Sequence, residues 1–440
     1  MRNRVKFVAV MLVAALLFTG CTMRTVGQMY QLPKRSEDYS NLQAVMDKAM
    51  VGLQFSAPIA GENQQSVQMA DIDGDEEAEY LVFCKGSAEL PLRILVFDRV
   101  DGVFTHIDTI ECNGADFDQV EYIQMDEKAG VEVIVGHRIS DMLTGSVSVY
   151  TFADGESERL ITTNYRKFLI VDMDGNEQRE LFVLRSGQSE TDPGVAELYS
   201  LSEGIVERSN EVNMSAPVDK LKRILVGKLY DGKPAVFVAT SVGDTSLVTD
   251  VYTFMDRHLS NVVKIDPQGM GTQTLRNYYI YADDIDNDGV TELPRFITMR
   301  PLNNESNTEA NKLVLWYAMG SGGNTMDKLY TYYNAAGGWY LTIDSKLVSR
   351  ITVQAEANTF AFYLWNSNFT KTEKLFTIYT LTGQNREEQS LSDGKFVLLK
   401  TDTTIYSATL EGAAAEYGIT QESLIGSFNQ IHQDWNSGEM

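Results

Sequence analysis

Asp71-Ile-Asp-Gly-Asp-Glu-Glu-Ala-Glu79 is the stretch that decides the fold, because it recurs along the chain. It returns as Asp172-Met-Asp-Gly-Asn-Glu-Gln-Arg-Glu180 and as Asp284-Ile-Asp-Asn-Asp-Gly-Val-Thr-Glu292, starting 101 and then 112 residues further on. Eroded copies at 124–132 and 228–235 lie about halfway between these three. The sequence is therefore built from repeats of roughly 50 residues.

Each repeat contains four short β runs in a fixed order. One run leads into the acidic stretch, as at 167–171, and a second leaves it, as at 180–184. A third and a fourth run follow around a turn such as Asp154-Gly155. Four short strands per repeat are typical of a propeller blade. We therefore predict an all-β chain in which residues 60–412 form a β-propeller of about seven four-stranded blades, with six as the alternative. A last strand is expected to pair near Val67 and close the ring.

Both flanks of the repeats show helical periodicity. Ser40-Asn-Leu-Gln43 has the form of a capping box, which predicts a short helix over residues 40–56. Thr420 can cap a second helix, which we expect over residues 413–440 against one end of the propeller. The apolar face predicted for this second helix consists of Leu424, Ile425, Phe428, Ile431 and Trp435.

Oxygen-bearing side chains occupy positions one, three, five and nine of each intact acidic stretch. Such clusters suit a hard cation with six to eight oxygen ligands, and Ca²⁺ tolerates the irregular geometry of a short loop. We predict three structural Ca²⁺ sites, with the carbonyl of position seven as a further ligand; an empty hydrated turn is the alternative. The candidate ligands are Asp71, Asp73, Asp75, Glu77, Glu79, Asp172, Asp174, Asn176, Gln178, Glu180, Asp284, Asp286, Asp288, Val290 and Glu292.

These stretches resemble the calcium loops of FG-GAP and VCBS-type propellers, the class that includes the integrin α-subunit head. The resemblance implies that the ions are structural and hold a loop at a blade edge. The family usually has glycine at position six, where the backbone is left-handed. Only Gly289 matches, whereas Glu76 and Glu177 depart from the pattern. The third loop is therefore expected to be the best occupied. An EF-hand is excluded, because it would need a glutamate at position twelve and flanking helices.

The N-terminus has the features of an exported lipoprotein. A basic start and an apolar run from Phe7 to Phe18 indicate a signal peptide over residues 1–20. Phe18-Thr-Gly-Cys21 resembles the lipobox of bacterial lipoproteins, which implies cleavage before Cys21 and a lipid on its sulfur. We therefore expect a membrane-anchored protein on the extracytoplasmic face, with residues 21–39 as a tether.

Composition narrows the partners. The formal net charge of −24 disfavours nucleic acid as a ligand, because the surface repels phosphates. Besides Cys21, the chain has only Cys84 and Cys112, for which two buried free thiols and a single disulfide both remain open.

No catalytic motif is present in the sequence, and the four histidines fall in separate segments. We therefore expect a binding or scaffolding module whose ligand is a protein or a glycan, and not an enzyme. Two alternatives remain: an enzyme that uses carboxylates at the propeller funnel on cell-surface polysaccharide, and a purely structural subunit of a surface complex. Aromatic residues gather between 316 and 340, where either a strand-rich core or a sugar-binding face fits the pattern.

Overall fold

The computed structural model describes residues 37–431, apart from residues 88, 140–143, 154, 190, 203 and 303–311. The predicted signal peptide, Cys21 and most of the predicted tether lie outside the described residues. In the part of the chain that is described, no helix combines the length and the apolar character needed to cross a membrane.

The described residues form six antiparallel sheets, which we name A to F in chain order. Sheets A to C contain β1 (Gln54–Phe55), β2 (Val67–Ala70), β3 (Glu79–Lys85), β4 (Leu92–Val100) and β5 (Val103–Cys112); β6 (Asp116–Ile123), β7 (Glu132–Arg138), β8 (Gly145–Ala153) and β9 (Glu156–Tyr165); and β10 (Lys167–Val171), β11 (Glu180–Arg185), β12 (Val195–Ser202), β13 (Ile205–Arg208) and β14 (Val212–Asn213). Sheets D to F contain β15 (Leu221–Lys228), β16 (Pro234–Val242), β17 (Ser246–Met255) and β18 (His258–Asn261); β19 (Glu292–Thr298), β20 (Lys312–Met319), β21 (Thr325–Asn334), β22 (Trp339–Ile343) and β28 (Phe428–Gln430); and β23 (Ile351–Glu356), β24 (Thr359–Trp365), β25 (Thr372–Thr382), β26 (Phe396–Lys400) and β27 (Thr404–Leu410). The all-β prediction is confirmed.

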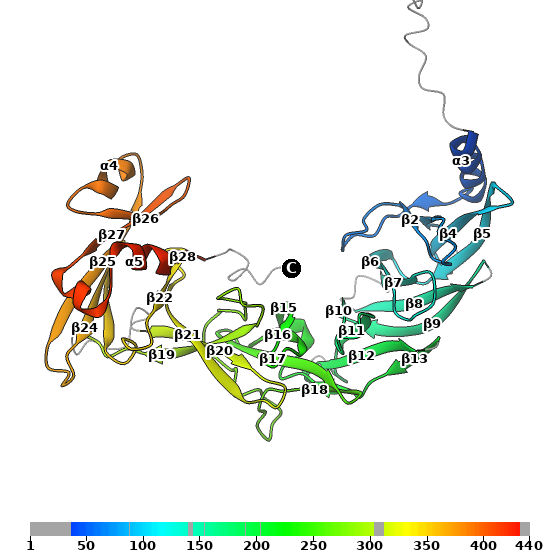
Figure 1. Cartoon of the computed structure of the whole chain (residues 1–440). Helices are drawn as coiled ribbons and strands as arrows, with labels where there is room; N and C mark the ends of the chain where they lie inside the picture. Colours follow the sequence, from blue (N-terminus) through cyan, green and yellow to red (C-terminus); the bar gives the residue numbers. More distant parts are fainter. Residues whose placement is uncertain are drawn as a thin grey trace, which may run out of the picture.

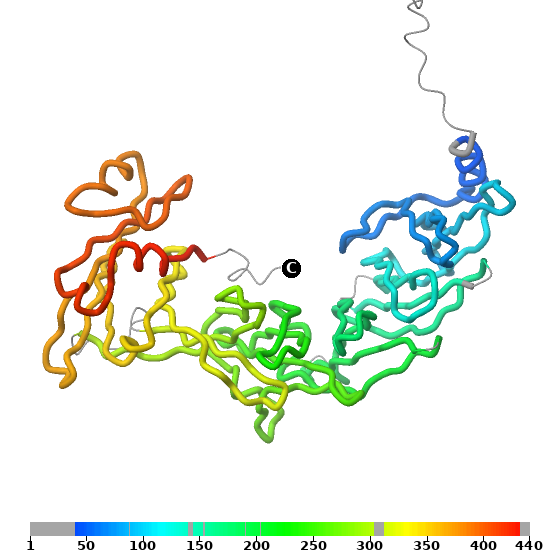
Figure 2. The backbone as a smooth tube through the Cα atoms, viewed as in Figure 1, coloured from blue at the N-terminus to red at the C-terminus, as the bar shows by residue number. Residues whose placement is uncertain are grey.

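The sheets follow one another along an open arc (Figure 1). Figure 2 shows the chain running once along this arc, from the N-terminal sheet at one end to the C-terminal sheet at the other. In sheets A to D, β2, β6, β10 and β15 lie on the inner side of the arc, and β5, β9, β13 and β18 lie on the outer side. Short helices lie at the two ends: α3 (Glu37–Ala49) beside sheet A, and α4 (Arg386–Leu391) and α5 (Gln421–Ser427) near sheet F. Two 3₁₀ turns complete the described elements, η1 (Val218–Lys220) and η3 (Gly412–Tyr417).

The core lies between successive sheets. Alternate residues of each inner strand point to its two neighbours, so one strand contributes to two packed layers. Phe83 of sheet A meets Phe117 of sheet B edge to face, with ring centroids 5.1 Å apart. Trp339 of sheet E meets Phe360 of sheet F in the same way at 5.1 Å. Burial of these faces, and not of isolated sheets, is what stabilises the fold.

The number of sheets differs from the expected seven. Residues 262–291 contain no regular strand but two isolated bridges, Arg276 with Leu247 and Asp283 with Glu292, and helix α4 is inserted between β25 and β26 of sheet F. The last third of the chain therefore uses more residues per sheet than the 50-residue repeat does. The described residues form six sheets, and the number of propeller blades stays a prediction.

The expected ring closure is not made by any strand pair of the described residues. β2, which contains Val67, pairs only with β3, whereas the last strand, β28, pairs with β22. The reason lies at sheet A, because α3 covers the face that a closing sheet would need. Leu42 of α3 packs there on Val82, Leu95 and Phe97.

The C-terminal helix is much shorter than predicted. Thr420 caps it as expected, in a capping box with Ser423, but α5 ends at Ser427. Phe428 begins β28 instead, and its ring stacks on Trp339 at 5.2 Å. By pairing with β22, residues 428–430 satisfy the hydrogen-bonding groups at the edge of sheet E, which a continued helix would leave unpaired. Trp435 lies outside the described residues.

The packing of α3 on sheet A predicts that shortening a side chain between them lowers the stability of the protein. Leu42→Ala should lower the free energy of unfolding by about 2–4 kcal/mol, because it leaves a cavity between α3 and sheet A. Asp47→Ala, an exposed position on the same helix, is the control and should change it by less than about 0.5 kcal/mol. Urea unfolding of both variants measures this, and equal effects would show that α3 does not stabilise the sheet.

Candidate functional site

Five loops, acidic or eroded, join the first two strands of successive repeats. We number them along the chain as loop I (71–79), loop II (124–132), loop III (172–180), loop IV (228–235) and loop V (284–292). In four of them the residue before the loop pairs with position nine. The four pairs are Ala70 with Glu79, Ile123 with Glu132, Val171 with Glu180, and Asp283 with Glu292.

A buried glutamate anchors each of these four loops. The glutamate at position nine is at most 4% exposed, and one of its oxygens accepts a hydrogen bond from the backbone N–H of position two. The position-two side chain is itself buried, so the bond fixes the loop on the core. The bonds run from Ile72 to Glu79 (2.8 Å), from Met125 to Glu132 (2.9 Å), from Met173 to Glu180 (2.7 Å) and from Ile285 to Glu292 (3.1 Å).

Three loops gather carboxylates as the sequence predicted. In loops I, III and V, one oxygen from each of positions one, three and nine lies within 4.8 Å of the others. The groups are Asp71, Asp73 and Glu79; Asp172, Asp174 and Glu180; and Asp284, Asp286 and Glu292. Positions five and seven are not part of these groups. Instead, these two positions form a local turn, in which the side chain of position five accepts a hydrogen bond from the backbone N–H of position seven. In loop I, Asp75 Oδ1 accepts from the N–H of Glu77 at 2.8 Å.

The clusters fit a bound cation. Glu79 Oε1 and Glu292 Oε1 are buried without a hydrogen-bond partner in the described structure. Burial raises the pKa of Glu79 to about 7, and the charge of Asp73 adds to the rise. Burial likewise raises the pKa of Glu180 to about 7 and that of Glu292 to about 8. Because every candidate ligand is an oxygen, these clusters can bind a hard metal ion.

Positions four and six have a left-handed backbone in all three acidic loops. Gly74, Gly175 and Asn287 occupy position four, and the φ angles at position six are 72° for Glu76, 73° for Glu177 and 84° for Gly289. A side chain in this region costs about 1 kcal/mol relative to glycine. The two glutamates are therefore held there by the hydrogen bonds of the loop, since Asp71 Oδ2 accepts from the N–H of Glu76 at 3.1 Å.

Loop V already contains a positive charge from elsewhere in the chain. The Lys328 ammonium, on β21, contacts Asp288 Oδ2 and lies 3.8 Å from Asp286 Oδ2. Its side chain is only 15% exposed, and the contact with Asp288 raises its pKa. This arrangement weighs against the expectation that loop V is the best occupied. No pattern within the loop could have revealed it, because Lys328 belongs to a different strand.

Loop II lacks the aspartate of position one. It has Gln124 at position one, and the side-chain amide of Gln124 donates to the carbonyl oxygens of Asp126 (2.6 Å) and Lys128. The amide hydrogens thus lie among the loop oxygens. Loop IV has no such cluster: Lys228 pairs directly with Pro234 around a tight turn.

Loops I and III differ in their surroundings. Loop I packs closely on loop II, since a Cβ on Gly74 would lie 2.4 Å from the Cβ of Ala129. Loop III instead borders a pocket of about 450 Å³, lined by Asp174 and Glu180 together with Arg208 and others. A cation in loop III would therefore be more accessible than one in loop I.

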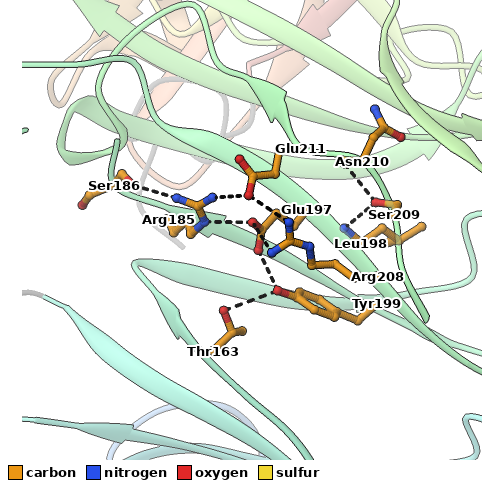
Figure 3. A network of polar contacts seen from close by, with 10 residues as sticks. All are labelled: Thr163, Arg185, Ser186, Glu197, Leu198, Tyr199, Arg208, Ser209, Asn210 and Glu211. Carbon is orange, nitrogen blue, oxygen red and sulfur yellow. Dashed lines mark hydrogen bonds and ion pairs between the residues drawn. The ribbon is translucent and has the colours of Figure 1, made fainter. Parts of the chain in front are cut away.

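A network of charged side chains includes Arg208 of this pocket (Figure 3). Glu197 is fully buried, and its oxygens accept from Arg185 Nε at 2.9 Å and from the hydroxyl of Tyr199 at 2.7 Å. Glu211 pairs with Arg185 at 2.8 Å and with Arg208 at 3.0 Å. Two guanidinium groups thus face two carboxylates, so the network is balanced in charge and braces sheet C.

The remaining candidates from the sequence have structural surroundings. Cys84 and Cys112 are both free and buried, on opposite faces of sheet A, so they do not form a disulfide. His137 is buried, and burial lowers its pKa. Among the aromatic residues between 316 and 340, Trp316 and Trp339 are fully buried core residues, whereas Tyr333 is half-buried and borders a second pocket.

Comparisons with known proteins give only distant likenesses. No protein-family model matches the sequence, and no curated protein matches it. Similar solved structures include the exotype rhamnogalacturonan lyase YesX, with 13% identity, a TM-score of 0.27, and coverage of 74% of this chain and 69% of that one. The Bacillus licheniformis rhamnogalacturonan lyase PL11 has 12% identity, a TM-score of 0.29, and coverage of 71% and 83%. Saccharomyces cerevisiae Sqt1 has 10% identity, a TM-score of 0.29, and coverage of 80% and 86%. Scores this low carry no argument about function.

Because the Lys328 ammonium occupies loop V, we predict how many cations the chain binds. The wild-type chain should bind two Ca²⁺ ions, and Lys328→Met should bind three, because removing the ammonium opens loop V. Equilibrium dialysis with elemental analysis counts the ions. Lys374→Met, which removes an exposed ion pair with Glu411, is the control and should leave the count at two. Three ions in the wild type would show that Lys328 gives way to the metal.

The raised pKa values of the buried glutamates predict a pH dependence. In chelator, the folded chain retains protons on Glu79, Glu180 and Glu292 that the unfolded chain loses above about pH 4.5. The folded state binds more protons, so the free energy of unfolding should fall as pH rises from about 5 to 8. Glu79→Gln should flatten this slope in thermal unfolding scans at several pH values. An unchanged slope in that variant would contradict the assignment.

Proposed function

We propose that this chain is a lipid-anchored, extracytoplasmic binding or scaffolding module, in which Ca²⁺ at loops I and III has a structural role. The proposal includes the finer fold: the six sheets act as blades of a propeller-type arrangement related to FG-GAP and VCBS repeats. The observation that carries it is the repetition of one anchored loop geometry in four repeats. Repetition at this level favours a structural device over a single reaction centre.

Contacts between neighbouring loops support a bracing role for the cations. The N–H of Arg179, in loop III, donates to the carbonyl of Gln124 in loop II at 3.3 Å. The N–H of Thr291, in loop V, donates to the carbonyl of Lys228 in loop IV at 2.9 Å. An ion that fixes loop III therefore also fixes loop II, and with it the junction between sheets B and C. Loops V and IV make the same kind of contact without a proposed cation.

Anchoring at the membrane rests on the N-terminal sequence. The charged start, the apolar run and the cysteine at position 21 support a lipid on Cys21. α3 begins at Glu37, so only a short segment separates the proposed lipid from the folded part. The sheets would then lie close to the outer surface of the membrane, where a protein or glycan ligand is available.

Thermal unfolding with and without calcium tests the structural role. About 1 mM Ca²⁺ should raise the unfolding temperature by several degrees relative to excess EDTA. A ligand present at 100 times its Kd adds about 2.7 kcal/mol to the free energy of unfolding. The double variant Asp71→Asn, Asp172→Asn should lose most of the shift, because asparagine keeps the size of the side chain but removes its charge. Asparagine also loses at least one of the hydrogen bonds that each aspartate accepts from backbone N–H groups, so the stability of the variant in EDTA is its own reference. Glu62→Ala, an exposed acid outside the loops, should retain it. The absence of any shift in the wild type would overturn the calcium proposal.

A further inference from the structure

A second pocket, unrelated to the acidic loops, lies where sheets D, E and F meet. Its volume is about 560 Å³, which falls in the range of small-molecule sites. Strand ends and hairpin turns from all three sheets contribute to its wall. The wall residues that matter for its chemistry are Asp244, Asn277, Tyr278, Tyr279, Phe296 and Tyr333.

Aromatic side chains dominate this wall. Six of its fifteen lining residues are aromatic, in a chain where aromatic residues make up 10% of the total. Tyr278, Tyr279, Phe296 and Tyr333 are half-buried, so part of each ring faces the opening. The pocket therefore offers flat aromatic surfaces to a ligand, and few aliphatic side chains line it.

Part of this aromatic surface is preorganised. The rings of Tyr278 and Phe296 stack with centroids 3.4 Å apart and an interplanar angle of 26°. The Tyr278 hydroxyl donates to the carbonyl of Pro294 at 3.3 Å, and Lys312 Nζ lies 4.8 Å from the Phe296 ring centre. Rings held in this way lose little freedom when a ligand packs on them.

Free polar groups border the aromatic surface. Asp244, Thr245 and Asn277 are exposed, and within the described residues their side chains hydrogen-bond to no other protein group. A carboxylate, a hydroxyl and an amide together accept and donate. A ring that presents apolar C–H faces and hydroxyls around its edge matches both features, and this is the chemistry of a sugar.

Charge narrows the ligand further. The wall has one acid, Asp244, and one base, Lys312, although the chain as a whole has a net charge of −24. An acidic polysaccharide would meet repulsion from the rest of the surface without a basic site to offset it. A proline-rich peptide also packs on aromatic rings, but it presents chiefly carbonyl acceptors. The mixed donors and acceptors at this rim favour hydroxyls.

We propose that this pocket binds a neutral saccharide segment of a surface glycan. Sugar rings pack on Tyr279 and the neighbouring aromatic rings, while Asp244 and Asn277 bind hydroxyl groups. The inference rests on the proposed function and names the ligand class for it. It places ligand recognition on sheets D to F, away from loops I and III, so calcium stabilises the fold without touching the sugar.

Calorimetric titration of the purified chain in Ca²⁺ tests the proposal. The probes are neutral hexasaccharides of glucose, mannose, xylose and N-acetylglucosamine, with decaproline and hexagalacturonate as comparison ligands. At least one neutral sugar should bind. Tyr279→Ala should weaken it roughly three- to tenfold and Asp244→Ala by a similar factor, whereas Tyr279→Phe retains the ring and should restore affinity.

Tyr363→Ala is the matched control, because Tyr363 is half-buried on β24 and does not line the pocket. Its sugar affinity should equal that of the wild type. The proposal would be overturned if none of the neutral sugars bound, or if only decaproline or hexagalacturonate bound. It would also be overturned if the Tyr279→Ala and Asp244→Ala variants bound sugar as tightly as the wild type. The calcium-dependent shift in unfolding temperature, measured in the same variants, reports separately on the structural proposal. If the titrated sample contained shortened sugars, the protein would be an enzyme that cleaves them, and the proposal of a binding module would be overturned.

Discussion

The hydrogen bond from the N–H of position two to the buried glutamate of position nine is the interaction on which the loops depend. It places one carboxylate under each of four loops, against the core, where an uncompensated charge is costly. Glu79 and Glu292 each retain one oxygen without a hydrogen-bond partner among the described residues. Loops I and V therefore need a positive charge or a proton near that oxygen.

The repeats differ in the groups that surround this glutamate. Loops I and III assemble two aspartates beside the glutamate, which is a cluster suited to a cation. Loop V has the same cluster but receives the Lys328 ammonium from β21. Loop II replaces the first aspartate with Gln124, whose amide hydrogens bond to loop carbonyls. The backbone geometry thus persists while the compensating group changes, which is expected when the loop's role is to join two sheets.

Within residues 37–431, no strand pair joins the two ends of the arc, and each end has its own cover. α3 covers the free face of sheet A, and the N–H of Phe104 donates to Asn41 Oδ1 at 2.9 Å to fix it there. At the other end, the hydroxyl side chains of Thr352, Thr377 and Ser407 alternate along the strands of sheet F with the residues of its core. All three are buried, and their hydroxyl groups have no hydrogen-bond partner within the described residues.

The sequence by itself determined the repeat, the all-β class and the positions of the acidic loops. These features depend on residues close together in the chain, where strand alternation and turn geometry leave a local pattern. Only the tertiary structure decided the number of sheets, the end of the last helix at Ser427, the seal by α3 and the contact of Lys328 with loop V. The aromatic pocket belongs to this second group, because Tyr279 and Tyr333 come from separate segments. Such contacts join side chains that are distant in sequence, so they depend on how whole sheets pack and not on any local period.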